Sequence, residues 1–539
     1  MPLRPAALFA LLAVALAACA TPQARPRPQA ATTRLIARGL DDIRNFYIEP
    51  VSNRKLALFG ARNLLRQGGT LMVGESSRPG GGREFILTGG SRLLGTFVEP
   101  ENNDIRGWAR LLARFLAMAR AHAPKLAALD RQKLDTALFD GIAGALDRFS
   151  RYSPPAVTRA ERALRNGFGG IGVTLDDSKK GLVVIAVLPN GPAARAGLRP
   201  QDRILAINGK ASSALAENEI IAQLRGPIGS ALKLAVYRPH PPRKMNLRIT
   251  RGRIVIPAVR VRETGGIAIF TIASFNKSTT AIVARRLLSA KRRPLKGVVL
   301  DLRGNPGGLL EQAVELVDLF VQKGAIAASF GRNPLSDQYF VASGDSIAPN
   351  LPVVVLIDGE SASSAEVVTA ALQDLGRAVV LGSSSYGKGT VQTVQPLPNG
   401  GSLTLTWARL VTPEGYLLER HGVVPNLCTS GPGRGSRSPE SLIRETRAAT
   451  GALAKPRRAL DAAGWAALRR FCPSRRKDRA LDLEVALRLL SDPQLYAQAL
   501  RLVPAAPLAA PARASQGVRR AGPALTRSGA LLFFVRHRP

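Results

Sequence analysis

Three polar stretches of the sequence carry residue types that could bind an anion or stabilise a developing oxyanion. They are residues 301–308 (DLRGNPGG), 361–366 (SASSAE) and 385–392 (SYGKGTVQ). The first is a glycine-rich turn before a helical pattern, so its backbone N–H groups can point at an anion. The second opens another helical pattern, and a serine at a helix N-terminus lies where backbone N–H groups favour an oxyanion. The sequence therefore predicts a polar site built from these turns.

The pattern around these stretches predicts an α/β domain. Apolar runs typical of buried strands stand at residues 298–302, 353–357 and 378–381, and each polar stretch begins at or soon after one of them. Helical patterns at 309–320 and 364–375 alternate with these runs. Because strands that alternate with helices form parallel sheets, we expect a largely parallel core over about residues 267–425.

A region before this domain alternates short strand patterns with turns. Three of its segments, in this order, resemble a PDZ domain: residues 168–173 (FGGIGV), 192–198 (PAARAGL) and 202–209 (DRILAING). In such a domain the glycine-rich loop aims backbone N–H groups at the terminal carboxylate of a peptide. The candidate peptide-binding residues are Gly169, Gly170, Ile171, Gly172 and Val173.

The same resemblance implies how a peptide would bind. It would add as an extra strand beside residues 173–175, with Ile220, Ile221 and Leu224 of a helix forming the far wall. The expected partners are therefore proteins or peptides with exposed apolar C-termini.

With the PDZ-like region before them, the three polar stretches resemble the carboxyl-terminal processing peptidases, the tail-specific serine proteases of family S41. The resemblance runs from about Leu35 to Asn426, with one apparent insertion in the N-terminal region. Residues 146–150 match the loop before the PDZ domain, and residues 421–426 match the closing strand motif. The resemblance implies a serine endopeptidase that cleaves proteins near or from their C-terminal tails, with the PDZ domain capturing those tails.

The resemblance also assigns catalytic roles. Ser363 matches the nucleophile, Lys388 the general base and Gln392 the residue that orients the base. A serine hydroxyl is a weak nucleophile until a base takes its proton, and an ammonium group cannot act as that base. We therefore expect burial to keep the amine of Lys388 neutral.

Further residues follow from the same match. Asp374 falls at an acidic position to which the family sometimes gives an auxiliary role, and we count it as a catalytic candidate. The expected oxyanion-hole donors are the backbone N–H groups of Gly308 and Ser364, whereas Gly307 is expected only to shape the turn.

Three other classes of protein fit the residues less well. Residues 382–389 (GSSSYGKG) nearly spell a phosphate-binding loop, but the last position lacks the hydroxyl that Mg²⁺ requires. A Ser-His-Asp hydrolase needs a placed histidine, and none of the four is evidently so placed; His421 is more typical of a turn. A PDZ scaffold without activity would have no use for Ser363, Lys388 and Gln392 together.

The composition limits the classes of protein and the partners that we expect for this chain. The chain has 539 residues, 45% of them apolar, which is enough for two to four domains and excludes a disordered protein. Its 76 Lys and Arg residues against 38 Asp and Glu give a net charge of +38, but these residues are scattered among Ala, Leu, Gly and Pro. We therefore expect no specific nucleic-acid partner. With four histidines and no CxxC spacing we also expect no metal site, and no cofactor.

The N-terminus resembles an export signal. Residues 6–18 form an apolar run that is too short to span a bilayer, and residues 16–19 (LAAC) resemble the lipobox of bacterial lipoproteins. The sequence thus predicts a periplasmic lipoprotein anchored through a lipid on Cys19, with a soluble secreted protein as the alternative. In an oxidising compartment Cys428 and Cys472 could pair, although the sequence does not decide this.

The expected fold class is a multidomain mixture of α/β and α+β. An adaptor or a homo-oligomer is left open. Two amphipathic helices are expected at residues 481–489 and 493–502, and residues 505–539 are expected to be unstructured. The predicted order is a lipoprotein-type signal peptide (1–18), a linker (19–33), a helical N-terminal region (34–166), a PDZ domain (167–256), an S41 peptidase core (257–430) and a basic, partly disordered C-terminal extension (431–539).

Overall fold

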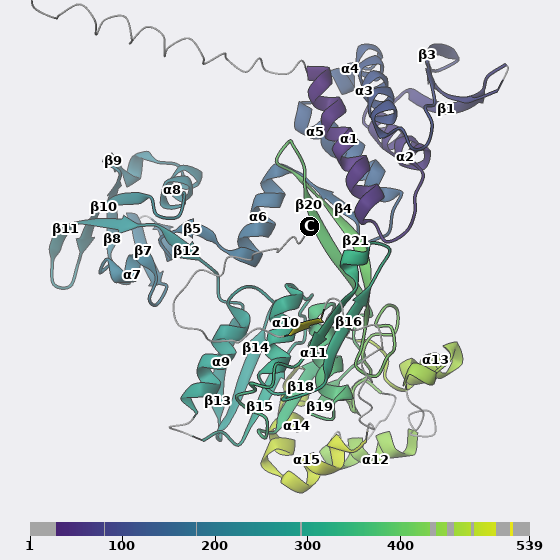
Figure 1. Cartoon of the computed structure of the whole chain (residues 1–539). Coiled ribbons are helices and arrows are strands. Elements are labelled where there is room, and N and C mark those ends of the chain that lie inside the picture. Colours follow the sequence, from purple (N-terminus) through teal and green to yellow (C-terminus); the bar gives the residue numbers. More distant parts are fainter. Residues whose placement is uncertain are drawn as a thin grey trace, which may run out of the picture. The chain divides into compact units, whose positions relative to one another are not determined.

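The computed structural model describes most of the chain (Figure 1). The described residues are 28–79, 81–178, 181–290, 294–431, 438–449, 457–475, 479–502 and 518–520. The predicted signal peptide, Cys19 and nearly all of residues 505–539 lie outside them. Within the described ranges, no helix combines the length and the apolar character needed to cross a membrane.

The N-terminal unit is helical, with capping residues that explain where its helices begin. The side chains of Ser52, Asp104 and Asp130 accept hydrogen bonds from backbone N–H groups in the first turns of α2, α3 and α5. Its helices are α1 (Pro28–Phe46), α2 (Asn53–Arg66), α3 (Ile105–His122), α4 (Pro124–Ala127) and α5 (Arg131–Gly144).

A glycine-rich stretch after α2 interrupts the helices of this unit. It forms a three-stranded antiparallel sheet of β1 (Leu71–Ser77), β2 (Arg83–Gly89) and β3 (Arg92–Val98). One side of this sheet is buried, because Phe85 and Phe97 pack against the rings of Trp108 and Phe115 on α3. A short strand, β4 (Arg151–Ser153), and helix α6 (Pro155–Asn166) follow.

The next segment is a small β-domain with two helices. Its main sheet has the order β11-β10-β8-β7-β6 and encloses an apolar core that includes Val184, Ile207 and Leu234. An ion pair at 2.8 Å ties β10 to the start of β8: Arg238 of β10 contacts the buried Asp202, which directly precedes β8. The elements are β5 (Phe168–Gly170), β6 (Val173–Ser178), β7 (Gly181–Val187), α7 (Pro192–Arg195), β8 (Arg203–Ile207), β9 (Lys210–Ala211), α8 (Glu217–Leu224), β10 (Ala231–Arg238), β11 (Arg243–Thr250) and β12 (Gly252–Ile254).

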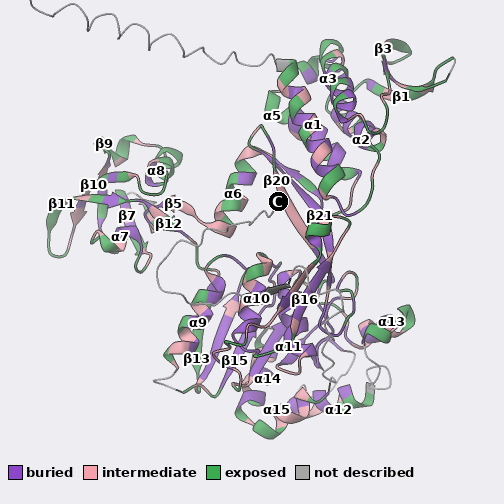
Figure 2. Cartoon of the chain, in the orientation of Figure 1, coloured by how far each residue is buried: buried purple, intermediate pink, exposed green. Residues whose placement is uncertain are grey.

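The following domain is built on a six-stranded sheet of order β13-β14-β15-β18-β19-β22. Only the pairing of β13 with β14 is antiparallel, so the expected α/β domain with a largely parallel core is confirmed. Its central strands are buried along their whole length (Figure 2), as parallel strands covered on both faces must be. The elements are β13 (Val259–Thr264), β14 (Ile267–Ile272), α9 (Thr279–Ser289), β15 (Gly297–Asp301), α10 (Leu310–Asp318), β18 (Val353–Ile357), α11 (Ser364–Asp374), β19 (Val379–Gly382) and β22 (Leu427–Cys428).

A second sheet contains β20 (Thr390–Pro396), β21 (Ser402–Val411), β16 (Ala325–Phe330), β17 (Gln338–Val341) and β23 (Val518–Arg520). Strand β20 begins two residues after Lys388, so the lysine lies in the loop that leads from the first sheet to the second.

The described part of the C-terminal extension is folded onto the α/β domain. Helices α14 (Arg479–Ser491) and α15 (Pro493–Leu500) occupy the two segments where the sequence predicts amphipathic helices. Val485 and Leu489 pack on Val354 and Leu356 of the parallel sheet, on the face opposite α10 and α11. The expected boundary at residue 430 therefore cuts through one hydrophobic core. The remaining elements are α12 (Pro439–Ala449) and α13 (Ala462–Phe471).

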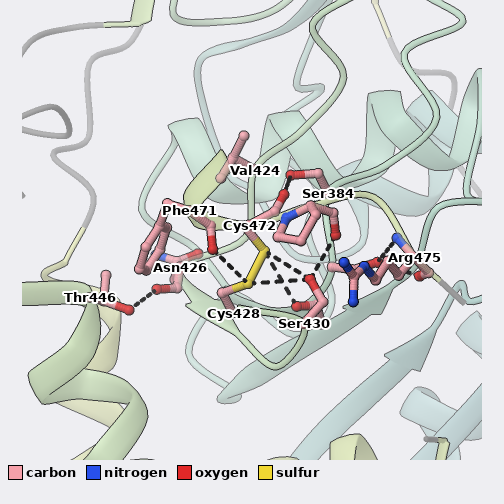
Figure 3. Close-up of a disulfide and its surroundings, with 12 residues drawn as sticks. Ser384, Val424, Asn426, Cys428, Ser430, Thr446, Phe471, Cys472 and Arg475 are labelled. Atoms are coloured by element: carbon pink, nitrogen blue, oxygen red, sulfur yellow. Dashed lines mark hydrogen bonds between the residues drawn. A yellow bond between two sulfur atoms is a disulfide. The ribbon is translucent and has the colours of Figure 1, made fainter. Parts of the chain in front are cut away.

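A disulfide ties this extension to the sheet. Cys428 on β22 is bonded to Cys472, which ends α13, with their Cα atoms 5.7 Å apart (Figure 3). Ser430 lies between the two cysteines and donates a hydrogen bond of 2.7 Å to the carbonyl of Pro473. The pairing that the sequence left open is therefore present, and it spans the predicted boundary of the core.

Reduction of this disulfide is expected to lower the free energy of unfolding by about 2–4 kcal/mol, because the bond restricts the unfolded chain over a separation of 44 residues. Urea denaturation with and without reductant measures the effect. The double variant Cys428→Ser/Cys472→Ser is the control and should not respond to reductant. Equal midpoints for the oxidised and reduced parent would contradict this expectation.

Candidate active site

Ser363 stands at the N-terminus of α11 in an unusual backbone conformation. Its φ of 56° and ψ of −118° lie outside the regions that residues with a side chain normally occupy. Such strain persists only where the surroundings hold it, and it is concentrated at functional sites. The backbone N–H of Ser363 donates to Oε2 of Glu366 at 2.8 Å, and the side chain is partly exposed. The turn therefore presents the hydroxyl at the start of the helix.

The carboxylate of Glu366 organises the site. It is fully buried and accepts four hydrogen bonds: Oε2 from the backbone of Ser363 and of Lys388 (3.0 Å), and Oε1 from the Ser385 hydroxyl and the Gly387 backbone, both at 2.6 Å. Burial raises the pKa of Glu366, and these hydrogen bonds oppose the rise. One oxygen atom thus joins the backbones of the predicted nucleophile and base.

Glu366 is part of the sequence motif at residues 361–366, although the resemblance to family S41 assigns it no role. A signal was present, because a glutamate three residues after a serine at a helix N-terminus is the pattern of a capping box. Its side chain does bond the backbone of the capping residue, as that pattern predicts. The additional bonds to the lysine loop depend on the tertiary structure.

The glycine-rich loop lies directly against the serine. A Cβ atom at Gly307 would come within 2.8 Å of the Ser363 Cβ, so the close approach requires glycine there. The Ser364 hydroxyl donates to the Gly308 carbonyl at 3.0 Å, which joins the loop to α11. Among the described residues, the backbone N–H groups of Gly308 and Ser364 donate to no protein acceptor, so both are available to a ligand.

Lys388 and Gln392 lie at the start of the second sheet. Lys388 is half-buried, and its backbone is held by Glu366 as described. The side-chain amide of Gln392 donates to the hydroxyl of Thr390 at 2.8 Å and to that of Thr406 at 3.4 Å. These bonds hold the amide group of Gln392 against the sheet.

Asp374 is not brought together with the other predicted catalytic residues. It ends α11, whereas Ser363 precedes that helix, so the two are about 15 Å apart. Its buried carboxylate accepts from the backbone of Glu414 at 3.1 Å and pairs with Arg457 at 3.5 Å. Burial raises the pKa of Asp374 to about 6. This position is suited to stabilising the core and not to touching a substrate at Ser363.

The groove of the β-domain contains four of the five predicted peptide-binding residues. It has a volume of about 630 Å³ and lies between the glycine-rich segment with β6 and helix α8. Gly169 does not line it; a Cβ there would lie 2.0 Å from the carbonyl oxygen of Gly226. The lining includes Gly170, Ile171, Gly172 and Val173 on one side and Ile220, Ile221 and Leu224 on the other.

Comparison with known proteins identifies the family. The model of peptidase family S41 matches residues 266–428, and that of the PDZ domain matches residues 159–237. The carboxy-terminal-processing protease of Bartonella bacilliformis is 35% identical over 308 residues, which are 56% of this chain and 71% of that protein. The chain belongs to the carboxyl-terminal processing peptidases of family S41. It is a serine peptidase with a PDZ domain.

Two further proteins with which this S41 peptidase was compared share a smaller fraction of identical residues. A probable CtpA-like serine protease of Staphylococcus aureus (strain N315) is 32% identical over 307 residues, 56% of this chain and 61% of that protein. Among solved structures, the photosystem II D1 C-terminal processing protease is 27% identical with a TM-score of 0.33, covering 56% of this chain and 84% of that one. The S41 match ends at residue 428, before α13 and α14.

The raised pKa of Asp374 predicts a pH-dependent stability. Between about pH 4 and pH 6 the folded peptidase keeps a proton that the unfolded chain releases, so the contribution of this carboxyl group falls as pH rises through that window. The stability of the parent relative to Asp374→Asn should therefore fall by up to about 3 kcal/mol from pH 4 to pH 7. Denaturation of both proteins at each pH measures it. The exposed Asp345→Asn variant is the control, and a difference that is constant with pH would contradict the assignment.

Proposed function

We propose that this S41 peptidase cleaves proteins near or from their C-terminal tails through a Ser363–Lys388 dyad. The observation that carries the proposal is the shared acceptor: one oxygen of Glu366 binds the backbones of both residues. This shared acceptor brings the loop that carries Lys388 next to the strained serine at the helix N-terminus, as a dyad requires.

The proposed reaction follows from the residues present. The neutral amine of Lys388 takes the proton from the Ser363 hydroxyl, and Oγ attacks the scissile carbonyl carbon. The resulting oxyanion accepts hydrogen bonds from the backbone N–H groups of Gly308 and Ser364. Lys388 then gives its proton to the leaving amine, and water hydrolyses the acyl-enzyme in a second cycle of the same transfers. Gln392 orients the base without adding a negative charge that would keep it protonated.

In the same proposal the PDZ domain captures the substrate's tail. Ile171 and Val173 on one wall, and Ile220 and Leu224 on the other, make the groove apolar. An extended tail would pair with β6 through its backbone and bury apolar side chains between these walls. The substrates are therefore proteins with exposed apolar C-termini.

We also propose that the protein is exported to the bacterial periplasm and anchored by a lipid on Cys19, with secretion without a lipid as the alternative. The disulfide supports export, because such bonds persist in oxidising compartments. Mass spectrometry of the protein purified from its native membrane measures the modification. An unmodified mature protein starting after another residue would exclude the lipoprotein.

Ser363→Ala and Lys388→Ala are each expected to reduce turnover of an unstructured peptide with an apolar tail by at least about 10³-fold, because each removes one partner of a proton transfer. Turnover is measured by mass spectrometry of the products. Lys323→Ala, which changes an exposed lysine of the same domain, should keep parental activity. Undiminished cleavage by Ser363→Ala would eliminate the nucleophile, and binding without cleavage by the parent would support a scaffold instead.

Ile221→Lys is expected to raise KM for the same peptide roughly tenfold or more with little change in kcat, because it places a charge in the apolar groove. Ile185→Lys is the matched control: Ile185 is 53% exposed, Ile221 is 42% exposed, and Ile185 does not line the groove. Equal KM values for the two variants would remove tail capture from the proposal.

A further inference from the structure

The segment from α13 to Arg475, residues 462–475, lies beyond the residues that match family S41. It nevertheless contacts the stretches that lead to Ser363 and to Lys388. We call it the α13 segment. Its C-terminal end follows the disulfide at Cys472, so it is covalently fixed to the parallel sheet.

Beyond the disulfide, the α13 segment holds the stretches that lead to Lys388 and Ser363. The hydroxyl of Ser384 donates to the carbonyl of Cys472 at 2.6 Å (Figure 3). The hydroxyl of Ser383 donates to the carbonyl of Arg475 at 2.7 Å. The same Arg475 carbonyl accepts from the backbone of Gly359, four residues before Ser363, at 3.2 Å. One short piece of backbone therefore joins both loops.

Arg469 makes the contact nearest to Lys388. Its Nη2 donates to the carbonyl of His421 at 2.7 Å. A Cβ at Gly387 would lie 3.0 Å from the same nitrogen, so the guanidinium group rests on the backbone next to the lysine. The backbone N–H of Arg420 donates to the Gly387 carbonyl at 3.0 Å, which links the loop that carries Lys388 to the loop of Arg420 and His421.

His421, whose carbonyl accepts the hydrogen bond from Arg469, is itself held in place. The ring of Trp465, one turn earlier on α13, stacks on His421 with centroids 4.2 Å apart and an interplanar angle of 21°. Burial lowers the pKa of Arg469, and the negative charge of Glu366 opposes that effect.

We propose that Arg469 is a positioning residue for the peptidase reaction: by holding Gly387 and the His421 carbonyl, it sets the place of Lys388 relative to Ser363. The inference rests on the proposed dyad. It assigns a mechanistic role to a residue outside the family match, through its contact with the loop that carries Lys388.

The test uses the full chain and the unstructured, apolar-tailed peptide. Arg469→Gln should lower kcat by roughly 10- to 100-fold, because a small displacement of a catalytic group is enough for such a loss, and should leave KM within about twofold. Arg469→Lys keeps the positive charge and one donor nitrogen but loses the planar shape of the guanidinium group. Its kcat should therefore lie between those of Arg469→Gln and the parent. Arg470→Gln removes the same charge from the exposed neighbour on the same helix and should match the parent.

Thermal unfolding of each variant separates positioning from folding. A lower kcat at a parental unfolding midpoint supports the proposal. Parental kcat in Arg469→Gln, or a loss no larger than the unfolded fraction, overturns it. If Arg469→Gln does not fold, Arg469→Lys decides: a kcat several-fold lower at a parental midpoint supports the proposal, and an unchanged kcat overturns it.

Ser363→Ala and Lys388→Ala, measured in parallel, distinguish the two levels of inference. If both abolish cleavage while Arg469→Gln is fully active, the dyad stands and only the positioning role fails. If neither reduces cleavage, the dyad itself is wrong.

Discussion

The buried carboxylate of Glu366 is the interaction on which the arrangement of the site depends. A carboxylate in the interior is costly unless hydrogen bonds replace its water, and four donors do so here. Because these donors come from the turn before α11 and from the loop before β20, the requirement to satisfy one charge fixes the two segments together. Loss of any donor would leave that charge partly unsatisfied, which is costly. The bond from the Ser363 backbone is therefore retained, and it holds the strained turn at Ser363.

The parallel sheet explains why these loops lie next to one another. The polar stretches all follow strands of one sheet, β15, β18 and β19, which pair as direct parallel neighbours. The carboxyl ends of such strands share an edge, which is where open α/β sheets bind their ligands. The small residues of the glycine-rich loop then allow it to lie against Ser363 without a steric clash.

The C-terminal extension contacts the sheet in two places. The α13 segment binds the stretch that leads to Lys388, and α14 packs on the face of the sheet opposite α10 and α11. Arg303 of the glycine-rich stretch is buried between Asp301, at 2.8 Å, and Asp482 of α14, at 3.1 Å. A buried arginine of this kind is tolerated because both sides of its planar group are paired. With the disulfide and the α13 segment, the extension contributes to the stability and to the geometry of the peptidase core.

The local residue pattern by itself determined the fold class and the three polar loops, because strand and helix periodicity and motif spacing are local properties. The resemblance to family S41 that these motifs carry then supplied Ser363 and Lys388 as the candidate pair. Only the tertiary structure decided that Cys428 pairs with Cys472, that Glu366 serves both loops, that Asp374 lies at the far end of its helix and that Gly169 is outside the groove. It also decided that residues after 430 complete the core, through contacts such as that between Arg303 and Asp482, 179 positions apart. Contacts between residues so far apart in the chain depend on how whole elements pack. The local sequence pattern therefore does not predict them.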